Sequence, residues 1–216
     1  MNFLKRIDNF FFEHLQEHYA KMLEKKVKPG LTLLDIGCGS NSPIQRFSKT
    51  LKYSVGIDGF QPSIDRSNAK VIHNEYVLMN VMDIETKFNE RSFDYVIASD
   101  LIEHLTKADG EKLISMMEKI ARKRVIIFTP NGFLEQREYD GNKYQVHLSG
   151  WEVDEMRKKG YNVTGINGWK LLRGEFGVAK WRPRVFWGRI SLLSQYFTTK
   201  NPKNAFAILC VKDIAV

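Results

Sequence analysis

The stretch Leu33-Leu34-Asp35-Ile36-Gly37-Cys38-Gly39-Ser40-Asn41 decides the fold of this chain. An apolar strand that runs into an acid and a Gly-x-Gly turn forms a cradle in which backbone N–H groups face a nucleotide. In folds that bind a dinucleotide diphosphate a third glycine follows, but Ser42 stands at that place here. The carboxylate of Asp35 would repel a diphosphate and favour a cationic amino or sulfonium group. The turn therefore predicts a nucleoside ligand that carries positive charge.

Composition indicates one domain. The chain has 216 residues with 43% hydrophobic content, which is enough for one α/β domain with appendages. Its two cysteines, Cys38 and Cys210, form no disulfide framework and no metal-binding pattern, so we expect a cytoplasmic protein and predict no metal site. Charged residues interrupt the apolar N-terminus, and no run of 18 apolar residues occurs, so neither a signal peptide nor a membrane span is expected.

Short apolar runs alternate with helical patterns along the chain, which predicts an α/β fold with a mostly parallel sheet. The expected strands are Thr32 to Ile36, Ser54 to Ile57, Glu75 to Val81, Phe93 to Ala98, Arg124 to Phe128, Tyr161 to Ile166 and Ala205 to Val211. Apolar residues three or four apart predict helices over 3–23 and 107–122. A capping box at Ser149 and Glu152 predicts a third helix that ends near Lys159. We expect one domain over 1–216, with a helical cap at 1–28 and a core at 31–170 and 205–212.

Two further acids follow the second and third expected strands. Asp58, with Gly59 and Phe60 after it, comes 21 residues after Gly37, where a carboxylate can accept hydrogen bonds from both ribose hydroxyls. Asp58 could instead cap its loop, and Phe60 could lie against an adenine or fill the space under the loop. After the next strand, Met82 and Asp83 could hold an adenine ring and its amino group, or Asp83 could be the N-cap of the turn that follows.

The fourth motif, Phe93 to Leu105, together with the other three, is similar to the class I S-adenosylmethionine-dependent methyltransferases. The resemblance implies a Rossmann-like three-layer sandwich with seven strands, the last antiparallel, and S-adenosylmethionine as cofactor. Ser99 and Asp100 would then line the methionine end of the pocket. The cofactor-binding residues expected from the four motifs are Asp35, Gly37, Cys38, Gly39, Asp58, Gly59, Phe60, Met82, Asp83, Ser99 and Asp100.

The segment from Pro130-Asn131 through His147-Leu148-Ser149-Gly150-Trp151 resembles the broad small-molecule, type 11 or quinone-methyltransferase-like group. Such an enzyme transfers a methyl group by in-line attack on the sulfonium methyl, which requires chiefly alignment and exclusion of water. A hydroxyl acceptor must also lose a proton, so His104 and His147 are the catalytic candidates, with Asp100 or Glu103 as partners. His147 could instead hydrogen-bond the loop backbone. Cys38 is interpreted as a small residue that permits close approach.

Excess positive charge lies near the end of the chain. The net charge is +8, and residues 170–203 hold eight lysines and arginines against Glu175 alone. Aromatic residues alternate with these cations, and we expect residues 174–202 to form a helical lid over the acceptor or a flap that contacts a membrane. The expected acceptor is a small molecule, either free or linked to a lipid or glycan.

Two other functions stay open. The first is an NAD-dependent oxidoreductase, which Asp35 and Asp83 disfavour. The second is a non-catalytic module of the same fold that binds an anionic surface or RNA. Motifs for methylation of nucleic-acid bases do not occur in the sequence, so we do not expect nucleic acid to be the substrate.

Overall fold

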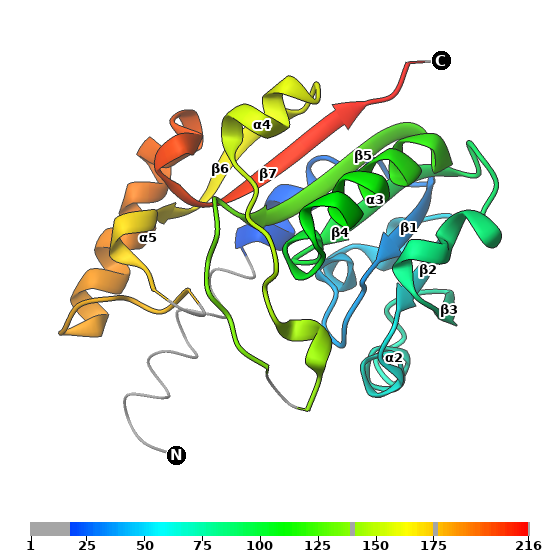
Figure 1. Ribbon diagram of the computed structural model, residues 1–216, viewed down its shortest axis with the longest axis horizontal. Coiled ribbons are helices and arrows are strands. Elements are labelled where there is room, and N and C mark those ends of the chain that lie inside the picture. Colours follow the sequence, from blue (N-terminus) through cyan, green and yellow to red (C-terminus); the bar gives the residue numbers. More distant parts are fainter. Residues whose placement is uncertain (1–17, 139–140, 175–176, 216) are drawn as a thin grey trace.

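The structure is a computed structural model that describes residues 18–138, 141–174 and 177–215. Within these residues a sheet of seven strands has the order β3-β2-β1-β4-β5-β7-β6 (Figure 1). The strands are β1 (Thr32–Ile36), β2 (Tyr53–Asp58), β3 (Glu75–Leu78), β4 (Phe93–Ser99), β5 (Ala121–Pro130), β6 (Asn162–Trp169) and β7 (Ala205–Asp213). Strands β1 to β5 pair in parallel, and β7 lies antiparallel between β5 and β6. The predicted α/β class and the antiparallel last strand are confirmed.

Helices cover both faces of the sheet. They are α2 (Gln61–Asn68), α3 (Lys107–Ile120), α4 (Val153–Lys158) and α5 (Arg184–Lys200), and residues 18–24 are also helical. Helices α3 and α4 bury their apolar side chains in the core on one face, and Tyr19 and Leu23 pack in the core on the other. The predicted apolar face of α3 is confirmed, because its side chains are buried (Leu113, Ile114, Met117 and Ile120).

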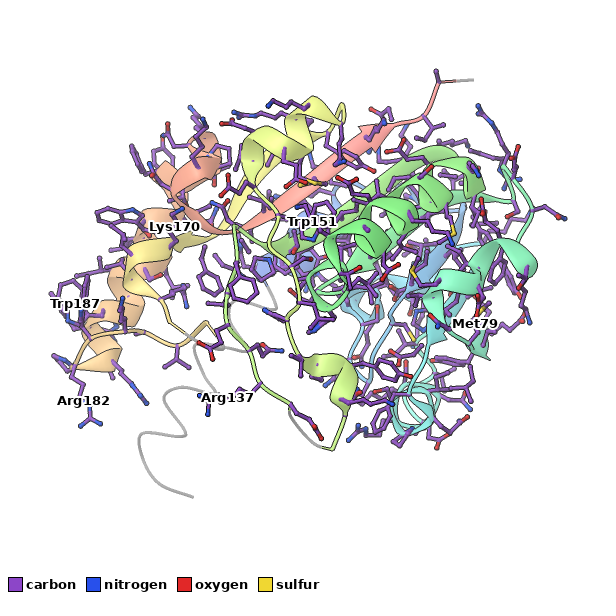
Figure 2. The ribbon with its side chains drawn as sticks, in the orientation of Figure 1. Met79, Arg137, Trp151, Lys170, Arg182 and Trp187 are labelled. Atoms are coloured by element: carbon purple, nitrogen blue, oxygen red, sulfur yellow. The ribbon has the colours of Figure 1, made fainter. Side chains whose placement is uncertain are left out.

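The helix after the capping pattern begins later than predicted. Helix α4 starts at Val153, and Glu152 caps it without a side-chain hydrogen bond. Ser149 is unavailable as a cap, because its hydroxyl donates to the carbonyl of Ile102 at 3.2 Å and accepts the indole N–H of Trp151 at 3.1 Å. Trp151 is fully buried and lies near the middle of the molecule (Figure 2). The predicted capping box is therefore wrong, and the same residues anchor the chain to the core.

Two other expectations need their bounds corrected. Strand β3 ends at Leu78, and residues 81–86 form a 3-10 helix (η3), so the predicted strand to Val81 is too long. Residues 1–17 of the predicted N-terminal helix lie outside the described residues, whereas residues 18–24 are helical. In the part of the chain that the structure describes, no helix has the length and apolarity to cross a membrane.

The basic segment contains a long helix at the edge of the sheet. Helix α5 packs against β6 (Figure 1) at two glycines where no side chain would fit. A Cβ on Gly165 would lie 2.1 Å from the carbonyl oxygen of Thr198, and one on Gly168 would lie 2.1 Å from that of Ser191. The helical part of the prediction for residues 174–202 is confirmed, and its role as a lid stays a prediction.

Candidate active site

The Gly-x-Gly turn follows β1 directly and is hydrogen-bonded to the carboxyl end of β2. Gly37 and Gly39 have φ values of 69° and 58°, a left-handed conformation that favours glycine. The N–H of Cys38 donates to the carbonyl of Ile57 at 2.8 Å, and the N–H of Gly39 donates to Asp58 Oδ2 at 2.9 Å. These bonds fix the turn against the end of β2, so the turn and Asp58 form one rigid edge.

Asp35 lies beneath this turn and not at its surface. Its carboxylate is 1% exposed, accepts a hydrogen bond from the Ser42 hydroxyl, and lies 2.9 Å from Nε2 of His73. Ser42 and His73 both contact Oδ2 of this carboxylate, whereas Oδ1 has no hydrogen-bond partner among the described residues, so the expected contact of Asp35 with a cationic ligand stays a prediction. The substitution of the third glycine by Ser42 also has a physical reason, since its hydroxyl is a partner of Asp35. No sequence motif identified His73.

Asp58 is held by backbone donors on both oxygens. Besides the bond from Gly39, its Oδ1 accepts the N–H of Phe60 at 2.8 Å. Burial raises the pKa of Asp58 above its usual value, against the lowering effect of these N–H groups. The loop-capping role is thus confirmed, and it leaves the second lone pair of each oxygen for a further donor. Gly59 is exposed, and Phe60 is half-buried.

The third acid lies on the surface of the short helix η3. Asn80 caps this helix by accepting the N–H of Met82 at 3.0 Å, so the interpretation of Asp83 as the N-cap is wrong. Asp83 is exposed, and Met82 is half-buried against the core. Among the described residues the Asp83 carboxylate has no hydrogen-bond partner, which leaves it available to an amino group.

At the end of β4 the helix at residues 18–24 meets the predicted pocket residues. The hydroxyls of Tyr19 and Ser99 lie 2.5 Å apart, and Asp100 follows with a φ of 48°. Burial, together with the nearby acids, holds the pKa of Tyr19 well above its usual value, against the lowering effect of the hydrogen bond to Ser99. Desolvation by the surrounding protein raises the pKa of the Asp100 carboxyl above its usual value. The sequence did not predict the contact of Tyr19 with Ser99.

The two histidines predicted to take part in catalysis, His104 and His147, are neighbours in the structure. Their ring centroids lie 4.7 Å apart, and the rings meet edge to face. Burial, with a smaller contribution from His147, lowers the pKa of His104 to about 4, and burial lowers the pKa of His147. Both rings are therefore neutral near pH 7. Their catalytic role stays a prediction.

The loop at residues 131–150 brings His147 to this place. His147 Nδ1 lies 2.6 Å from the carbonyl oxygen of Leu134, so the predicted hydrogen bond to the loop backbone is present. The same loop reaches the end of β2, where a Cβ on Gly59 would lie 3.8 Å from the Tyr144 ring. The loop thus connects the carboxyl ends of the strands from β5 to β2, and it joins the candidate acceptor residues to the cofactor residues.

Burial also explains the behaviour of Cys38. The surrounding protein, and then the carboxylates of Asp35 and Asp58, raise the pKa of its thiol far above the usual value. A thiol that stays protonated is a poor nucleophile. Cys38 is therefore a packing residue within the turn.

The fold and the geometry of the site agree with a match to a protein family. Residues 34–129 match the family model described as a methyltransferase domain. With the strand order and the rigid edge at Gly37, Gly39 and Asp58, this match over part of the chain supports a class I S-adenosylmethionine-dependent methyltransferase domain with S-adenosylmethionine as its cofactor.

Particular relatives are similar over only part of their length. The chain is 31% identical over 110 residues to a ubiquinone biosynthesis O-methyltransferase of Rhodopseudomonas palustris (strain TIE-1), covering 48% of this chain and 43% of the relative. It is 28% identical over 112 residues to the enzyme of that name from Bradyrhizobium sp. (strain ORS 278), with the same coverage. The chain therefore spans less than half of the length of these curated relatives.

Solved structures share the fold. Magnesium protoporphyrin IX methyltransferase from Synechocystis PCC 6803 with bound SAM is similar with a TM-score of 0.59 and 14% identity, covering 100% of this chain and 85% of that chain. A SAM-dependent methyltransferase from Archaeoglobus fulgidus is similar with a TM-score of 0.58 and 16% identity, covering 92% and 94%. At these identities the likeness shows the fold alone.

Proposed function

We propose that the chain transfers the methyl group of S-adenosylmethionine to an oxygen atom of a small-molecule acceptor, which is free or linked to a lipid or glycan. The acceptor oxygen attacks the methyl carbon, the bond from that carbon to sulfur breaks, and S-adenosylhomocysteine leaves. The acceptor hydroxyl loses its proton. Since the sulfonium is already activated, alignment and exclusion of water are the main requirements.

The geometry of Asp58 carries the proposal. Backbone N–H groups of Gly39 and Phe60 fix both carboxylate oxygens at the end of β2, and each oxygen keeps a lone pair for a ribose hydroxyl. Asp83, exposed after the neighbouring strand β3, is suited to receive the adenine amino group. Because β2 and β3 are neighbours, the ribose at Asp58 and the adenine at Asp83 would lie next to each other along this edge of the sheet.

An oxygen acceptor is supported by the groups beyond Ser99. The neutral imidazoles of His104 and His147 lie where the loop at residues 131–150 returns to the sheet. Neutral rings can take up the proton of a hydroxyl, although the pKa of about 4 makes His104 a weak base near pH 7. The curated relatives named as O-methyltransferases agree with this acceptor class.

Binding of S-adenosylhomocysteine tests the cofactor half of the proposal. Calorimetry of the wild type should give one site, and Asp58→Ala should weaken it by roughly thirtyfold or more, because charge-assisted hydrogen bonds are worth about 2 kcal/mol. Glu111→Ala, an exposed acid paired with Lys159, is the matched control. NAD should not compete, and competitive binding of NAD would favour the oxidoreductase. Incorporation of labelled methyl groups into phenols, quinols and lipid extracts tests the acceptor half.

A stripe on helix α5 suggests where a lipid-linked acceptor would be met. Positions three or four apart on a helix share a face. The exposed residues at this spacing are Phe186, Arg189, Leu193, Tyr196, Phe197 and Lys200. Tyr196 and Leu193 are 86% and 78% exposed, whereas Gly188, Ser191 and Thr198 on the opposite side are buried. We call this set of six exposed residues the α5 stripe.

The charge of α5 favours an anionic lipid surface as the partner. The helix contains no aspartate or glutamate, and its cations stand among the aromatic residues of the α5 stripe. Arg182 and Trp187 extend this composition at the N-terminal end of α5, far from Met79 after β3 (Figure 2). Apolar side chains flanked by arginine and lysine are typical of helices that lie in the headgroup region. We therefore propose that the α5 stripe contacts an anionic membrane.

A further inference from the structure

Three side chains that can bind metal ions converge beyond the end of β4. One ligand atom each from Glu103, His104 and His147 lie within 4.8 Å of one another. Glu103 and His104 follow each other on the short 3-10 helix Ile102–His104, whereas His147 comes from the loop at residues 131–150. The sequence spacing gave no sign of this cluster, because the loop separates the third residue from the other two.

Both histidines are oriented by the backbone. Nδ1 of His104 lies 3.2 Å from the carbonyl oxygen of Val146, and Nδ1 of His147 lies 2.6 Å from that of Leu134. Because a carbonyl only accepts, each Nδ1 carries the proton, and each Nε2 of the neutral ring keeps its lone pair. A metal-binding histidine has this arrangement, in which the nitrogen that does not bind the metal donates to a fixed oxygen.

The carboxylate of Glu103 lacks a compensating positive charge. Glu103 is 2% exposed, and its Oε2 accepts the hydroxyl of Thr129 at 2.9 Å. Its Oε1 is buried and has no hydrogen-bond partner, and no lysine or arginine of the described residues forms an ion pair with it. A buried carboxylate of this kind requires a proton or a cation.

We propose that Glu103, His104 and His147 bind a divalent transition-metal ion of the zinc or manganese class. Two imidazoles and one carboxylate form the ligand set of catalytic sites that keep a coordination position open for water or substrate. Ligand atoms on one ion with bonds of about 2.1 Å lie about 3.4 Å apart in tetrahedral geometry. The three groups would therefore move toward one another by about 1 Å on binding.

The ion would act on the acceptor, and this step rests on the proposed function. A hydroxyl oxygen of the acceptor occupies the open position, where the cation favours loss of its proton to water. The oxygen then attacks the sulfonium methyl, a new C–O bond forms, and the C–S bond breaks. His104 and His147 are then ligands and not bases, which agrees with Nδ1 atoms that are occupied by backbone carbonyls.

Cobalt and zinc titrations test the site without measuring turnover. Protein freed of metal with a chelator and then dialysed should bind one equivalent of Co²⁺ with visible absorption bands, and Zn²⁺ should displace the Co²⁺. Glu103→Gln and His147→Ala should weaken the binding by roughly a hundredfold, at least as much as loss of an outer partner does. Glu111→Gln is the matched control, since that acid is exposed and paired with Lys159. Wild-type protein that binds no Co²⁺, or a His147→Ala variant that binds it unchanged, would overturn the proposal.

Binding of S-adenosylhomocysteine to the same samples separates this proposal from the proposed function. Wild-type protein that binds S-adenosylhomocysteine but no metal would refute the metal site alone. Protein that binds Co²⁺ but no S-adenosylhomocysteine would refute the cofactor assignment and leave the metal site standing. If a variant fails to fold, the stoichiometry and spectrum of the wild type decide the question.

Discussion

Tyr19 stacks on Phe128 with ring centroids 3.8 Å apart and an angle of 15° between the rings, while its hydroxyl reaches Ser99. The helix at residues 18–24 is thereby joined to the ends of β4 and β5. Tyr19→Ala removes both contacts and should lower the free energy of unfolding by about 3 kcal/mol. Tyr19→Phe keeps the stacking and should cost only about 1 kcal/mol. Urea unfolding of both variants measures this difference, and equal losses would show that stacking contributes little.

Gly56 determines how closely His73 approaches the turn. A Cβ at this position would lie 2.9 Å from His73 Nδ1 and 3.0 Å from Cys38 Sγ, and both neighbours are buried. Gly56→Ala should therefore displace His73 from Asp35, cost about 1–3 kcal/mol of stability and weaken S-adenosylhomocysteine binding. Gly174→Ala is the control, because a Cβ there meets no atom within 4 Å. Unchanged affinity in Gly56→Ala would separate the position of His73 from cofactor binding.

Much of this fold could be predicted because each strand has a recognisable pattern in its own stretch of sequence. β1 has the bounds that its apolar residues predicted, Thr32 to Ile36, and Asp58 lies at the end of β2, where its spacing placed it. Contacts between distant residues carry no such local signal. His73 lies 38 positions from Asp35, and nothing in its own neighbourhood indicates that it encloses that carboxylate. The capping box failed for the same reason, since Trp151 and the Ile102 carbonyl compete for Ser149.

Asp94 lies at the opposite end of β4 from the candidate active site. Its carboxyl should make the free energy of unfolding depend on pH in the acid range. Burial alone would raise its pKa, but hydrogen bonds from Thr32, Arg122 and Lys123 lower the pKa to about 2. The ordinary value is near 3.9, so the ionised form stabilises the folded state by about 2 kcal/mol above pH 5. Protonation of Asp94 in the unfolded state removes this contribution as the pH falls from about 5 toward 2.

Asp94→Asn should remove the acid-dependent part of this stability. At pH 7 the variant should be less stable than the wild type by about 2 kcal/mol, and the difference should shrink as the pH falls toward 3. Urea unfolding at several pH values measures the difference. A difference that stays constant from pH 7 to pH 3 would mean that Asp94 has an ordinary pKa in the folded protein.

The α5 stripe should bind vesicles that contain phosphatidylserine, and added salt should weaken the binding. Leu193→Glu introduces a negative charge and removes an apolar side chain from the surface that meets the lipid. Binding should fall about tenfold or more, because burial of a leucine side chain is worth about 2 kcal/mol. Val71→Glu is the matched control, since Val71 is 77% exposed but lies after α2.

Co-sedimentation with vesicles distinguishes the possible partners of the stripe. Binding to phosphatidylserine vesicles but not to phosphatidylcholine alone would support an anionic surface, because the cations Arg189 and Lys200 contribute by attraction to charge. If Leu193→Glu binds as well as the wild type, the apolar part of the α5 stripe has no contact with lipid. Salt-sensitive binding to an oligoribonucleotide in the absence of vesicle binding would instead assign the stripe to RNA, whose phosphates attract the same cations but have no apolar layer to receive Leu193.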